Sequence, residues 1–463
     1  MANEKAGKNK KLKIGLEIHG YLITAEKLFC DCKNAHKEKT STPNTHICPI
    51  CTGQPGSKPM LPNAEAIKKL IQIALMLNCK VNSDKPLTWW RKHYDWPDLP
   101  KGFQNTISGT YATPVGENGS FLGIGITEVH LEEDPAAWNP DKGTIDYNRS
   151  GAPLVEIVTD PDFKSASEVE TWLRQLLLTL SYIKALDKDS GIKADVNVSL
   201  GGERVEVKNV NSISEIVKVI IHEAERQKTQ PATNQETRAW LGDKTVKTRE
   251  KEQQADYRFI KEPDLPVIKL SKQEVEKIKV SLPESPMEKL AKIIKKHKIS
   301  EYDANVLTQN LEIVEFFEQV INKVPAKIAV PWVTTELLGT LNHNKLTLDQ
   351  VNINPSHFIQ LLQLIEQGKL TKLKALDILR SWIPKSSPIK AEAAAAISDT
   401  NKIEKIVDKV LADKGNNKAV EDYKAGNEKT INFLIGQVMK LSNKRADYIT
   451  AKKLLEKKLK NNS

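Results

Sequence analysis

The sequence predicts an α+β fold: an antiparallel or mixed sheet, followed by an all-helical region. Before Pro283–Pro286, short segments alternate between apolar and polar residues and are separated by a few helical patterns. After this point nearly every apolar pattern has the spacing of a helix. The 463 residues allow two to four domains at roughly 100–200 residues each. We find no tandem repeat.

Four segments of the first region have one apolar and one polar face. In residues 12–24 the apolar positions place Glu17 and His19 together on the polar face. The same alternation is found in residues 124–134, 192–200 and 203–210. Strands of this kind indicate an antiparallel or mixed sheet with one side on the core. We expect helices over residues 63–77, 165–186 and 212–228 to cover that side.

The second region contains clear helix signals. Asn354-Pro355 is typical of a helix start, apolar residues follow at i, i+3, i+4 and i+7, and Gly368 provides a stop. Another helix is expected over residues 431–439. The polar stretch Asp413–Asn417 is interpreted as a linker into a last module. We therefore divide the chain into a flexible basic arm (1–11), a body (12–290), a helical connector (291–405) and a basic helical tail (406–463).

Charge and composition exclude several classes of protein. The chain has 69 Lys and Arg against 59 Asp and Glu, and residues 401–463 contribute 15 against 8. Such a local excess fits a surface that meets phosphates, or equally a solvated helix face. No apolar run approaches the ~18–20 residues of a membrane span, and the N-terminal arm has no apolar signal core. Because five cysteines are too few for a disulfide scaffold of this length, we expect a cytoplasmic protein.

Acids and histidines, with few long neutral residues, occupy the polar strand faces and the strand ends. They are Glu17, His19, Glu132, Glu133, Asp146, Glu156, Asp195 and Glu206. If these strands are neighbours, the carboxylates converge and their repulsion requires a cation, for which oxygen ligands with one imidazole favour Mg²⁺ or Mn²⁺. Phosphate charge beside such metals could be offset by Arg91, Lys92, Arg149 and Lys208. This pattern favours phosphoryl transfer. The alternative is ordinary solvated strand faces with surface ion pairs.

Four cysteines have the paired spacing of a zinc site. Cys30 and Cys32 form a CxC pair, and Cys48 and Cys51 form a CxxC pair. Four thiolates from two tight turns are the ligands of a closed, structural Zn²⁺ site. The alternative is four free thiols. Cys79 ends an apolar helix and is interpreted as a buried small hydrophobe.

Two further observations narrow the field. The stretch Trp89–Lys101 interleaves three tryptophans with cations, which suits either base stacking or a rigid loop packed on the core. The chain has no GxxxxGK[ST] motif, which excludes nucleotide binding by a phosphate loop of that kind. It also has no GxSxG nucleophile elbow, which excludes hydrolysis by a serine held in such an elbow.

Many ordered motifs resemble one family, the B subunits of the aspartyl/glutamyl-tRNA amidotransferases. The resemblance runs from about Lys13 to the C-terminus. It is carried by Ile14–His19, Lys27–Cys30, Cys48–Cys51, His93–Lys101, Gly125–Asp134, Asp146–Arg149, Pro153–Val158, Ala194–Ser199, Glu206–Ser212, Glu421–Lys424 and Asn432–Lys440. It implies a cradle-like catalytic domain, an all-helical domain and a small helical tail domain that binds tRNA. It also implies a heterotrimer with an amidase (A) subunit and a small C subunit.

The implied activity is an ATP- and Mg²⁺-dependent phosphorylation of the side-chain carboxylate of Glu-tRNA(Gln) or Asp-tRNA(Asn), followed by amidation with ammonia from the amidase subunit. Carried over by position, the Mg²⁺-binding and catalytic residues are Glu17, His19, Glu133, Glu156, Asp195 and Glu206, and the functional lysine is Lys92. Arg149 and Lys208 remain candidates for binding phosphate. The zinc ligands are Cys30, Cys32, Cys48 and Cys51.

Two points depart from the family pattern or refine it. Gly20-Tyr21 stands where many members have a β-branched or glutamine pair after the histidine, which alters the expected pocket wall. A related archaeal subunit carries an inserted domain of about a hundred residues, for which this chain has no room.

The competing hypothesis is a non-catalytic tRNA-binding scaffold with structural zinc. Alignment of acids on polar strand faces favours the enzyme.

Overall fold

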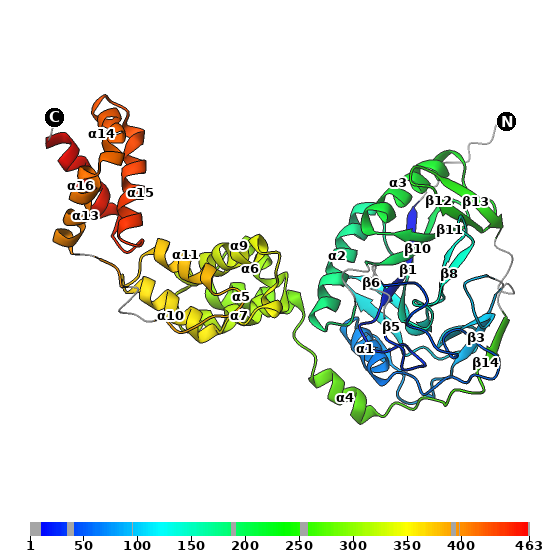
Figure 1. Cartoon of the computed structure of the whole chain (residues 1–463). Helices are drawn as coiled ribbons and strands as arrows, with labels where there is room; N and C mark the ends of the chain where they lie inside the picture. Colours follow the sequence, from blue (N-terminus) through cyan, green and yellow to red (C-terminus); the bar gives the residue numbers. More distant parts are fainter. Residues whose placement is uncertain are drawn as a thin grey trace, which may run out of the picture. The chain divides into compact units, whose positions relative to one another are not determined.

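The chain forms two compact units, Met1–Ser285 and Pro286–Ser463 (Figure 1). The computed structural model describes residues 11–34, 41–94, 96–186, 191–250, 258–389, 395–397 and 399–461. The expected basic arm, apart from Lys11, therefore lies outside the described residues. Among the described helices, none combines the length and the apolar character needed to cross a membrane.

The first unit is built mainly of strands. Its elements in chain order are β1 (Leu12–Tyr21), α1 (Ala64–Met76), β2 (Lys80–Val81), β3 (Trp90–His93), β4 (Phe103–Thr106), β5 (Gly116–Phe121), β6 (Ile124–Glu133), β7 (Ala137–Asn139), β8 (Thr144–Asp146), β9 (Pro153–Thr159), α2 (Ala166–Tyr182), β10 (Lys193–Leu200), β11 (Val205–Asn211), α3 (Ile213–Thr229), β12 (Glu236–Trp240), β13 (Thr245–Glu250), β14 (Arg258–Lys261) and α4 (Lys272–Val280).

One large mixed sheet dominates this unit. Its strands follow the order β13-β12-β11-β10-β1-β9-β6-β4-β3-β14, and β5 joins β6 to β2 beside this path. Every described pair in the sheet is antiparallel except β11–β12, which is parallel. A parallel pair needs a crossover, and α3 provides it. The sheet is thus mixed, as the sequence predicted.

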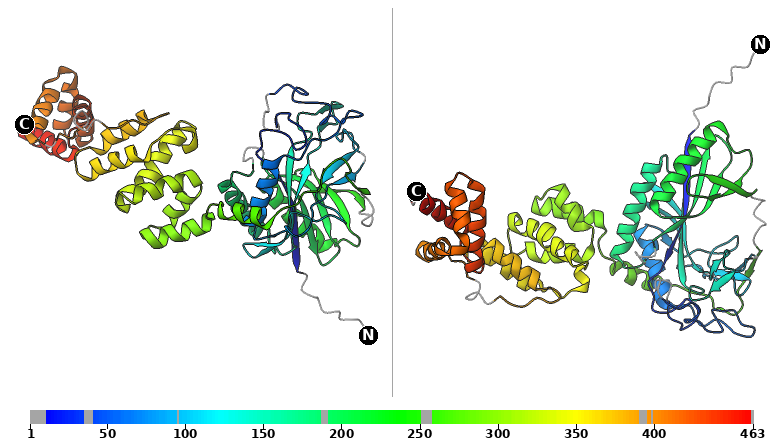
Figure 2. Two further views of the ribbon diagram at one scale, coloured as in Figure 1. Left: turned by 90° about the horizontal axis from the view of Figure 1, so that it is seen from below. Right: turned by 45° about the horizontal axis from the view of Figure 1, so that its top comes forward.

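The apolar face of the sheet is covered by α1, α2 and α3, which lie along one side of it (Figures 1 and 2). On β1, Ile14, Leu16 and Ile18 are at most 1% exposed and belong to this core. Each helix begins at a capping side chain that accepts backbone N–H groups of the first turn: Asn63, Ser165 and Ser212. The three predicted helices therefore form within a few residues of their expected positions.

The second unit is helical in all its described elements. These are α5 (Pro286–His297), α6 (Glu301–Thr308), α7 (Leu311–Ile321), α8 (Ala326–Pro331), a π-helical segment (Trp332–Leu337), α9 (Leu338–His343), α10 (Pro355–Glu366), α11 (Lys372–Ser381), α13 (Thr400–Ala412), α14 (Asn417–Lys424), α15 (Ile431–Leu441) and α16 (Tyr448–Asn461), with short 3₁₀ turns at Leu348–Gln350, Lys414–Asn416 and Glu428–Thr430.

The predicted signals of α10 are confirmed. Asn354 accepts the backbone N–H of Ser356 at 2.8 Å, and Gly368 follows the helix with a φ of +67°. A left-handed backbone of this kind favours glycine because it has no Cβ.

The tail has its own core, and this core shifts the expected boundaries. Ile403 and Val407 of α13 are buried together with Leu434 of α15 and Leu455 of α16. The expected boundary at residue 406 falls inside α13, and we therefore take this module to begin at α13. Within the expected linker Asp413–Asn417, residues Lys414–Asn416 form a 3₁₀ turn that leads into α14. Its Asn416 is buried and donates from Nδ2 to the carbonyl of Val410 at 2.9 Å.

Candidate functional site

The polar face of the sheet's central strands gathers the predicted acids. Because residues alternate along a strand, the burial of Ile14, Leu16 and Ile18 in the core leaves Glu17 and His19 on the opposite face. Register then aligns the neighbours: Glu17 pairs with Asp195 of β10, and His19 pairs with Glu156 of β9. Residues more than a hundred positions apart are thereby brought side by side. Two separate clusters result.

The first acid cluster consists of Glu17, Asp195 and Glu206, which could hold a metal ion, with ligand atoms within 4.8 Å of one another. Asp195 lies where the β10–β11 register shifts, between Ala194 and Val196, and it accepts the backbone N–H of Asn209 at 2.8 Å. Lys208 projects into this cluster: its Nζ lies 2.6 Å from Asp195 Oδ2 and 2.6 Å from Glu206 Oε1. Although burial opposes its charge, these carboxylates raise the pKa of Lys208.

The second acid cluster consists of His19, Glu132 and Glu156, again with ligand atoms within 4.8 Å of one another. His19 Nε2 lies 3.2 Å from Glu156 Oε2. Lys92 of β3 faces this cluster, with its Nζ 3.8 Å from Glu132 Oε1. Gln104 of β4 donates from Nε2 to Glu132 Oε2 at 3.1 Å. The predicted functional lysine therefore lies beside a carboxylate of the second acid cluster.

Charge is unevenly balanced across the two clusters. Burial and the nearby charge of Glu156 raise the pKa of Glu17. Burial would also raise the pKa of Glu156, but the positive charges of His130 and His19 outweigh it and hold that pKa well below the ordinary range. For His19, the charge of Glu156 and the hydrogen bond to it outweigh burial and raise the pKa to about 9. A divalent cation would relieve the repulsion around Glu17.

The donor set of the first acid cluster fits a hard divalent cation. Three carboxylates supply the oxygen ligands that Mg²⁺ prefers. Asn197, next to them on β10, donates from Nδ2 to Glu17 Oε1 at 3.1 Å. Its buried Oδ1 has no hydrogen-bond partner. A buried acceptor of this kind would be satisfied by a cation or by a water bound to one.

His130 belongs with these residues and was missed by the sequence prediction. It is 2% exposed, with Nδ1 3.0 Å from Glu128 Oε1 and Nε2 3.3 Å from Glu156 Oε2. The signal was present, because Glu128, His130 and Glu132 alternate along β6 on the same face as Glu156. His130 meets Glu156 because the two residues stand opposite each other in the β6–β9 pairing.

Glu133, in contrast, lies outside both clusters, and its neighbour Glu132 occupies the expected place. Consecutive strand residues point to opposite faces, so Glu133 is directed away from the side on which Glu132 lies. Glu133 Oε2 instead lies 2.5 Å from Lys101 Nζ and accepts from Asn105 Nδ2 at 3.1 Å. The sequence resemblance assigned Glu133 to the Mg²⁺-binding residues, but in the structure Glu132 and not Glu133 lies with His19 and Glu156.

Arg149 and Arg91 also lie outside the clusters. Arg149 Nε is 3.0 Å from Asp134 Oδ2, which accepts the hydroxyl of Tyr21 at 2.9 Å. Arg91 is on the opposite face of β3 from Lys92, where both its Nε and Nη2 donate to Glu262 at 2.8 Å. It helps to line a cleft between this face and the loop after Cys48. Among the predicted phosphate-binding cations, Lys92 and Lys208 adjoin the acid clusters.

The four predicted zinc ligands come together. The sulfur atoms of Cys30, Cys32, Cys48 and Cys51 all lie within 4.8 Å of one another, whereas Cys79 is buried elsewhere. Four thiols at this separation fit a tetrahedral Zn²⁺ site. A hydrogen bond from Cys30 lowers the pKa of Cys51 to about 4, with further contributions from the Cys48 backbone N–H and Lys27.

Lys27 is a further member of this site that the sequence did not predict. Its side chain is 1% exposed, and its Nζ lies 3.4 Å from Cys51 Sγ. It also donates to the carbonyls of His46 at 2.9 Å and Tyr147 at 3.1 Å. A buried ammonium group beside thiolates offsets their negative charge.

The tryptophan-rich stretch contains one residue that fits a loop packed on the core and one that fits an exposed stacking surface. Trp89 is 1% exposed and packs edge-on against Phe29 in the core. Trp96 is 55% exposed and contacts Trp138, with ring centroids 5.5 Å apart. The first tryptophan supports a packed loop, and the second presents an aromatic surface. Asp95 lies outside the described residues.

Comparisons with known proteins agree with this architecture. The family model described as the GatB/GatE catalytic domain matches residues 12–276, and the one described as the GatB domain matches residues 315–459. Together they cover most of the chain.

Three curated relatives illustrate the similarity. Each is named as the B subunit of an aspartyl/glutamyl-tRNA(Asn/Gln) amidotransferase. The protein of Methanococcus maripaludis is 42% identical over 97% of this chain and 98% of its own length. Those of Methanocaldococcus jannaschii and Methanopyrus kandleri are each 40% identical with the same coverage. The chain belongs to the family of aspartyl/glutamyl-tRNA(Asn/Gln) amidotransferase B subunits.

Proposed function

We propose that this chain carries the kinase and transamidase steps of a tRNA-dependent amidotransferase. In the first step, the side-chain carboxylate of Glu-tRNA(Gln) or Asp-tRNA(Asn) takes the γ-phosphoryl group of ATP, giving an acyl phosphate and ADP. In the second, ammonia attacks the acyl carbon, phosphate leaves, and a proton is lost. A carboxylate is a poor electrophile, and phosphorylation gives it a leaving group.

The observation that carries this proposal is the convergence of the two acid clusters with Lys92 and Lys208. Bound Mg²⁺ would offset phosphate charge and orient the phosphates for transfer. Glu17, Asp195 and Glu206 would hold one ion, and His19, Glu132 and Glu156 could hold a second. Lys92, whose Nζ lies 3.8 Å from Glu132 Oε1, would contact a phosphate oxygen. Lys208 would neutralise the acids and exchange its contacts when a cation or phosphate binds.

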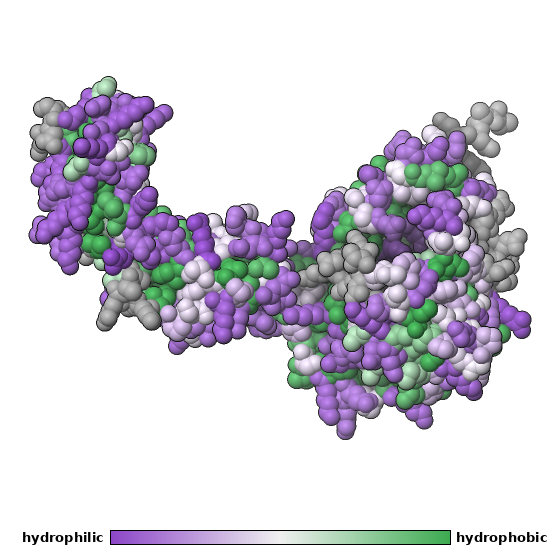
Figure 3. Space-filling model, in the orientation of Figure 1, coloured by the Kyte–Doolittle hydropathy of each residue, from purple (hydrophilic) through white to green (hydrophobic). Residues whose placement is uncertain are grey.

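Other parts of the chain have supporting roles. We assign structural Zn²⁺ to the four cysteines, with Lys27 offsetting their charge. The tail, α13–α16, carries many lysines and is largely hydrophilic on the face seen in Figure 3, so we assign it to the tRNA backbone. Ammonia would come from an amidase (A) subunit, with a small C subunit completing a heterotrimer. We place this complex in the cytoplasm.

The competing proposal is a non-catalytic tRNA-binding scaffold. It accounts for the zinc site and the basic tail. It gives no reason for burying Glu206 and Glu156 beside other acids, because uncompensated buried charge is costly. The acid clusters therefore favour the catalytic proposal.

The decisive experiment uses the purified full chain with Mg²⁺, labelled ATP, ammonium chloride and misacylated Glu-tRNA(Gln) or Asp-tRNA(Asn). ATP-dependent formation of the amide, measured by chromatography of the released amino acid, would support catalysis in this chain. If conversion requires the amidase partner, the same assay with Asp195→Asn in the complex locates the site. Wild-type conversion by that variant would favour the scaffold.

A further inference from the structure

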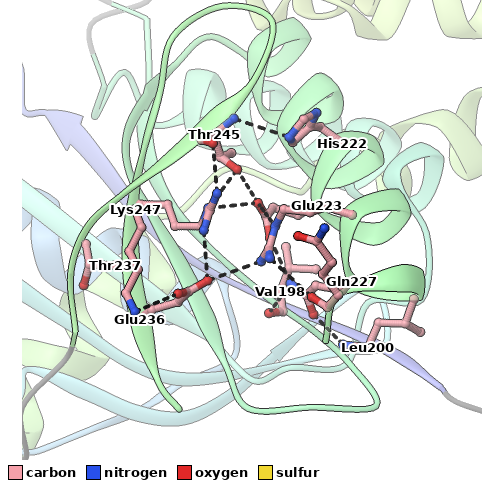
Figure 4. Close-up of polar contacts among 12 residues, drawn as sticks. Val198, Leu200, His222, Glu223, Gln227, Glu236, Thr237, Thr245 and Lys247 are labelled. Atoms are coloured by element: carbon pink, nitrogen blue, oxygen red, sulfur yellow. Dashed lines mark hydrogen bonds and ion pairs between the residues drawn. The ribbon is translucent and has the colours of Figure 1, made fainter. Parts of the chain in front are cut away.

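A buried ion network lies on the helix side of the sheet, away from both acid clusters. Its centre is Glu223 of α3, which is fully buried (Figure 4). One of its carboxylate oxygens lies 2.8 Å from Arg226 Nη2, and the other lies 3.4 Å from Arg238 Nε. Gln227 donates to it from Nε2 at 3.0 Å. None of these residues has a role in the proposed reaction.

The network joins three elements of the fold. Arg226 and Arg238 both reach Glu236 of β12, at 3.4 Å and 3.0 Å. Gln227 accepts the backbone N–H of Leu200 on β10 at 2.8 Å. Two carboxylates thus face two guanidinium groups, and the partly exposed Lys247 adds a further cation, with its Nζ 3.6 Å from Glu236 Oε2. The network connects α3 to β10 and β12, and loss of one of its buried members would leave an uncompensated charge.

The network holds one face of β12, and the other face of that strand meets the first acid cluster. In the parallel register, Arg238 pairs with Val207, and Thr237 pairs with Glu206. Thr237 is 4% exposed, and its Oγ1 donates to Glu206 Oε2 at 3.3 Å. Because faces alternate, a slip of β12 by one residue would turn Thr237 away from Glu206.

We propose that Thr237 is a positioning residue for the Glu206 carboxylate, and that the Glu223 network fixes the register that places it there. This rests on the proposed function, which assigns Glu206 to a Mg²⁺ site. The hydrogen bond from Thr237 engages Oε2 and leaves Oε1 directed toward Lys208, within 2.6 Å. Hydrogen bonds that orient a metal ligand contribute substantially to metal affinity.

The test compares matched variants of the full chain. Mn²⁺ is the probe, and free Mn²⁺ is measured by electron paramagnetic resonance during titration. We expect Thr237→Val to weaken Mn²⁺ binding by about 10-fold and Thr237→Ser to restore it. Thr248→Val is the control, because the Thr248 hydroxyl lies on the neighbouring strand and donates to the backbone carbonyl of Thr237, not to Glu206. It should bind Mn²⁺ as the wild type does.

A second readout separates positioning from damage to the fold. In the assembled enzyme, Thr237→Val should raise the Mg²⁺ concentration for half-maximal amidation by about 10-fold and keep the wild-type kcat at saturating Mg²⁺. Glu223→Gln, if circular dichroism shows it folded, should weaken Mn²⁺ binding similarly.

The outcomes distinguish this inference from the proposed function. Unchanged Mn²⁺ binding in Thr237→Val, or an equal loss in Thr248→Val, overturns the positioning role while the metal site stands. A wild-type chain that binds no Mn²⁺ overturns the metal assignment itself, and the positioning role with it.

Discussion

Glu17 and Asp195 stand directly opposite each other on the antiparallel strands β1 and β10, although 177 residues separate them along the chain. Their carboxylates lie close to that of Glu206, and Lys208 contacts two of the three. A site built on central strands of a packed sheet is held rigidly, as the proposed metal-dependent transfer would require.

Removing a carboxylate of the first acid cluster should stop the reaction and leave tRNA binding intact. Asp195→Asn and Glu206→Gln keep the side-chain shape but reduce the negative charge available to Mg²⁺. We expect amidation to fall by more than about 100-fold, measured in the assembled enzyme. Filter binding of tRNA should remain within about twofold, since the proposed tail contacts are untouched. Normal turnover in both variants would contradict the catalytic assignment.

Glu132 and Glu133 should respond differently to the same change. Glu132→Gln removes an acid from the second acid cluster and should weaken Mn²⁺ binding, measured by titration of the full chain. Glu133→Gln changes a residue that contacts Lys101 and Asn105, and Mn²⁺ binding should remain at the wild-type level. Equal losses in the two variants would show that the strand alternation does not decide the ligand.

The metal-free chain should lose stability at alkaline pH through His19. Its pKa is raised from 6.5 to about 9, with Glu156 as the source of the favourable charge. The stabilisation is fully present below pH 6.5 and is lost as the pH rises through about 9. It amounts to at most a few kcal/mol. In EDTA, the gap in melting temperature between wild type and His19→Gln should narrow from pH 6 to pH 9.5. A constant gap would refute the ion pair.

Lys27 should control how firmly zinc is held. Lys27→Met removes the buried charge beside Cys51 but keeps much of the side-chain volume. We expect zinc release to a chromogenic chelator to be about 10-fold faster than in the wild type. Lys33→Met, a change at an exposed lysine in the same segment, should release zinc at the wild-type rate. Identical rates in all three proteins would exclude a role for Lys27.

Deletion of the tail should weaken tRNA binding and flatten its dependence on salt, because fewer phosphate contacts release fewer counterions. The cut belongs before α13, at residue 397, because a cut at residue 406 would split that helix and expose Ile403. Affinity is measured by fluorescence anisotropy from 50 to 300 mM KCl. A salt slope equal to that of the full chain would disprove the tail assignment.

Much of this protein is determined by local sequence. Side chains alternate between the two faces of a strand. Because Ile14, Leu16 and Ile18 are apolar and face the core, Glu17 and His19 must lie on the opposite face of β1. Asn354-Pro355 marked a helix start, and the paired cysteines marked the thiol cluster. These features depend on neighbours a few residues apart, so the sequence alone contains them.

Tertiary structure decided which of those residues meet. The β6–β9 register brings His130 to Glu156, and strand alternation takes Glu133 away from the site. The parallel pairing of β12 with β11 brings Thr237 to Glu206. Buried Lys27 meets Cys51 only because the fold brings their two segments together. Contacts between residues so far apart in the sequence depend on the order and register of the strands. Strand order and register arise from packing over the whole sheet, and no short sequence pattern specifies them.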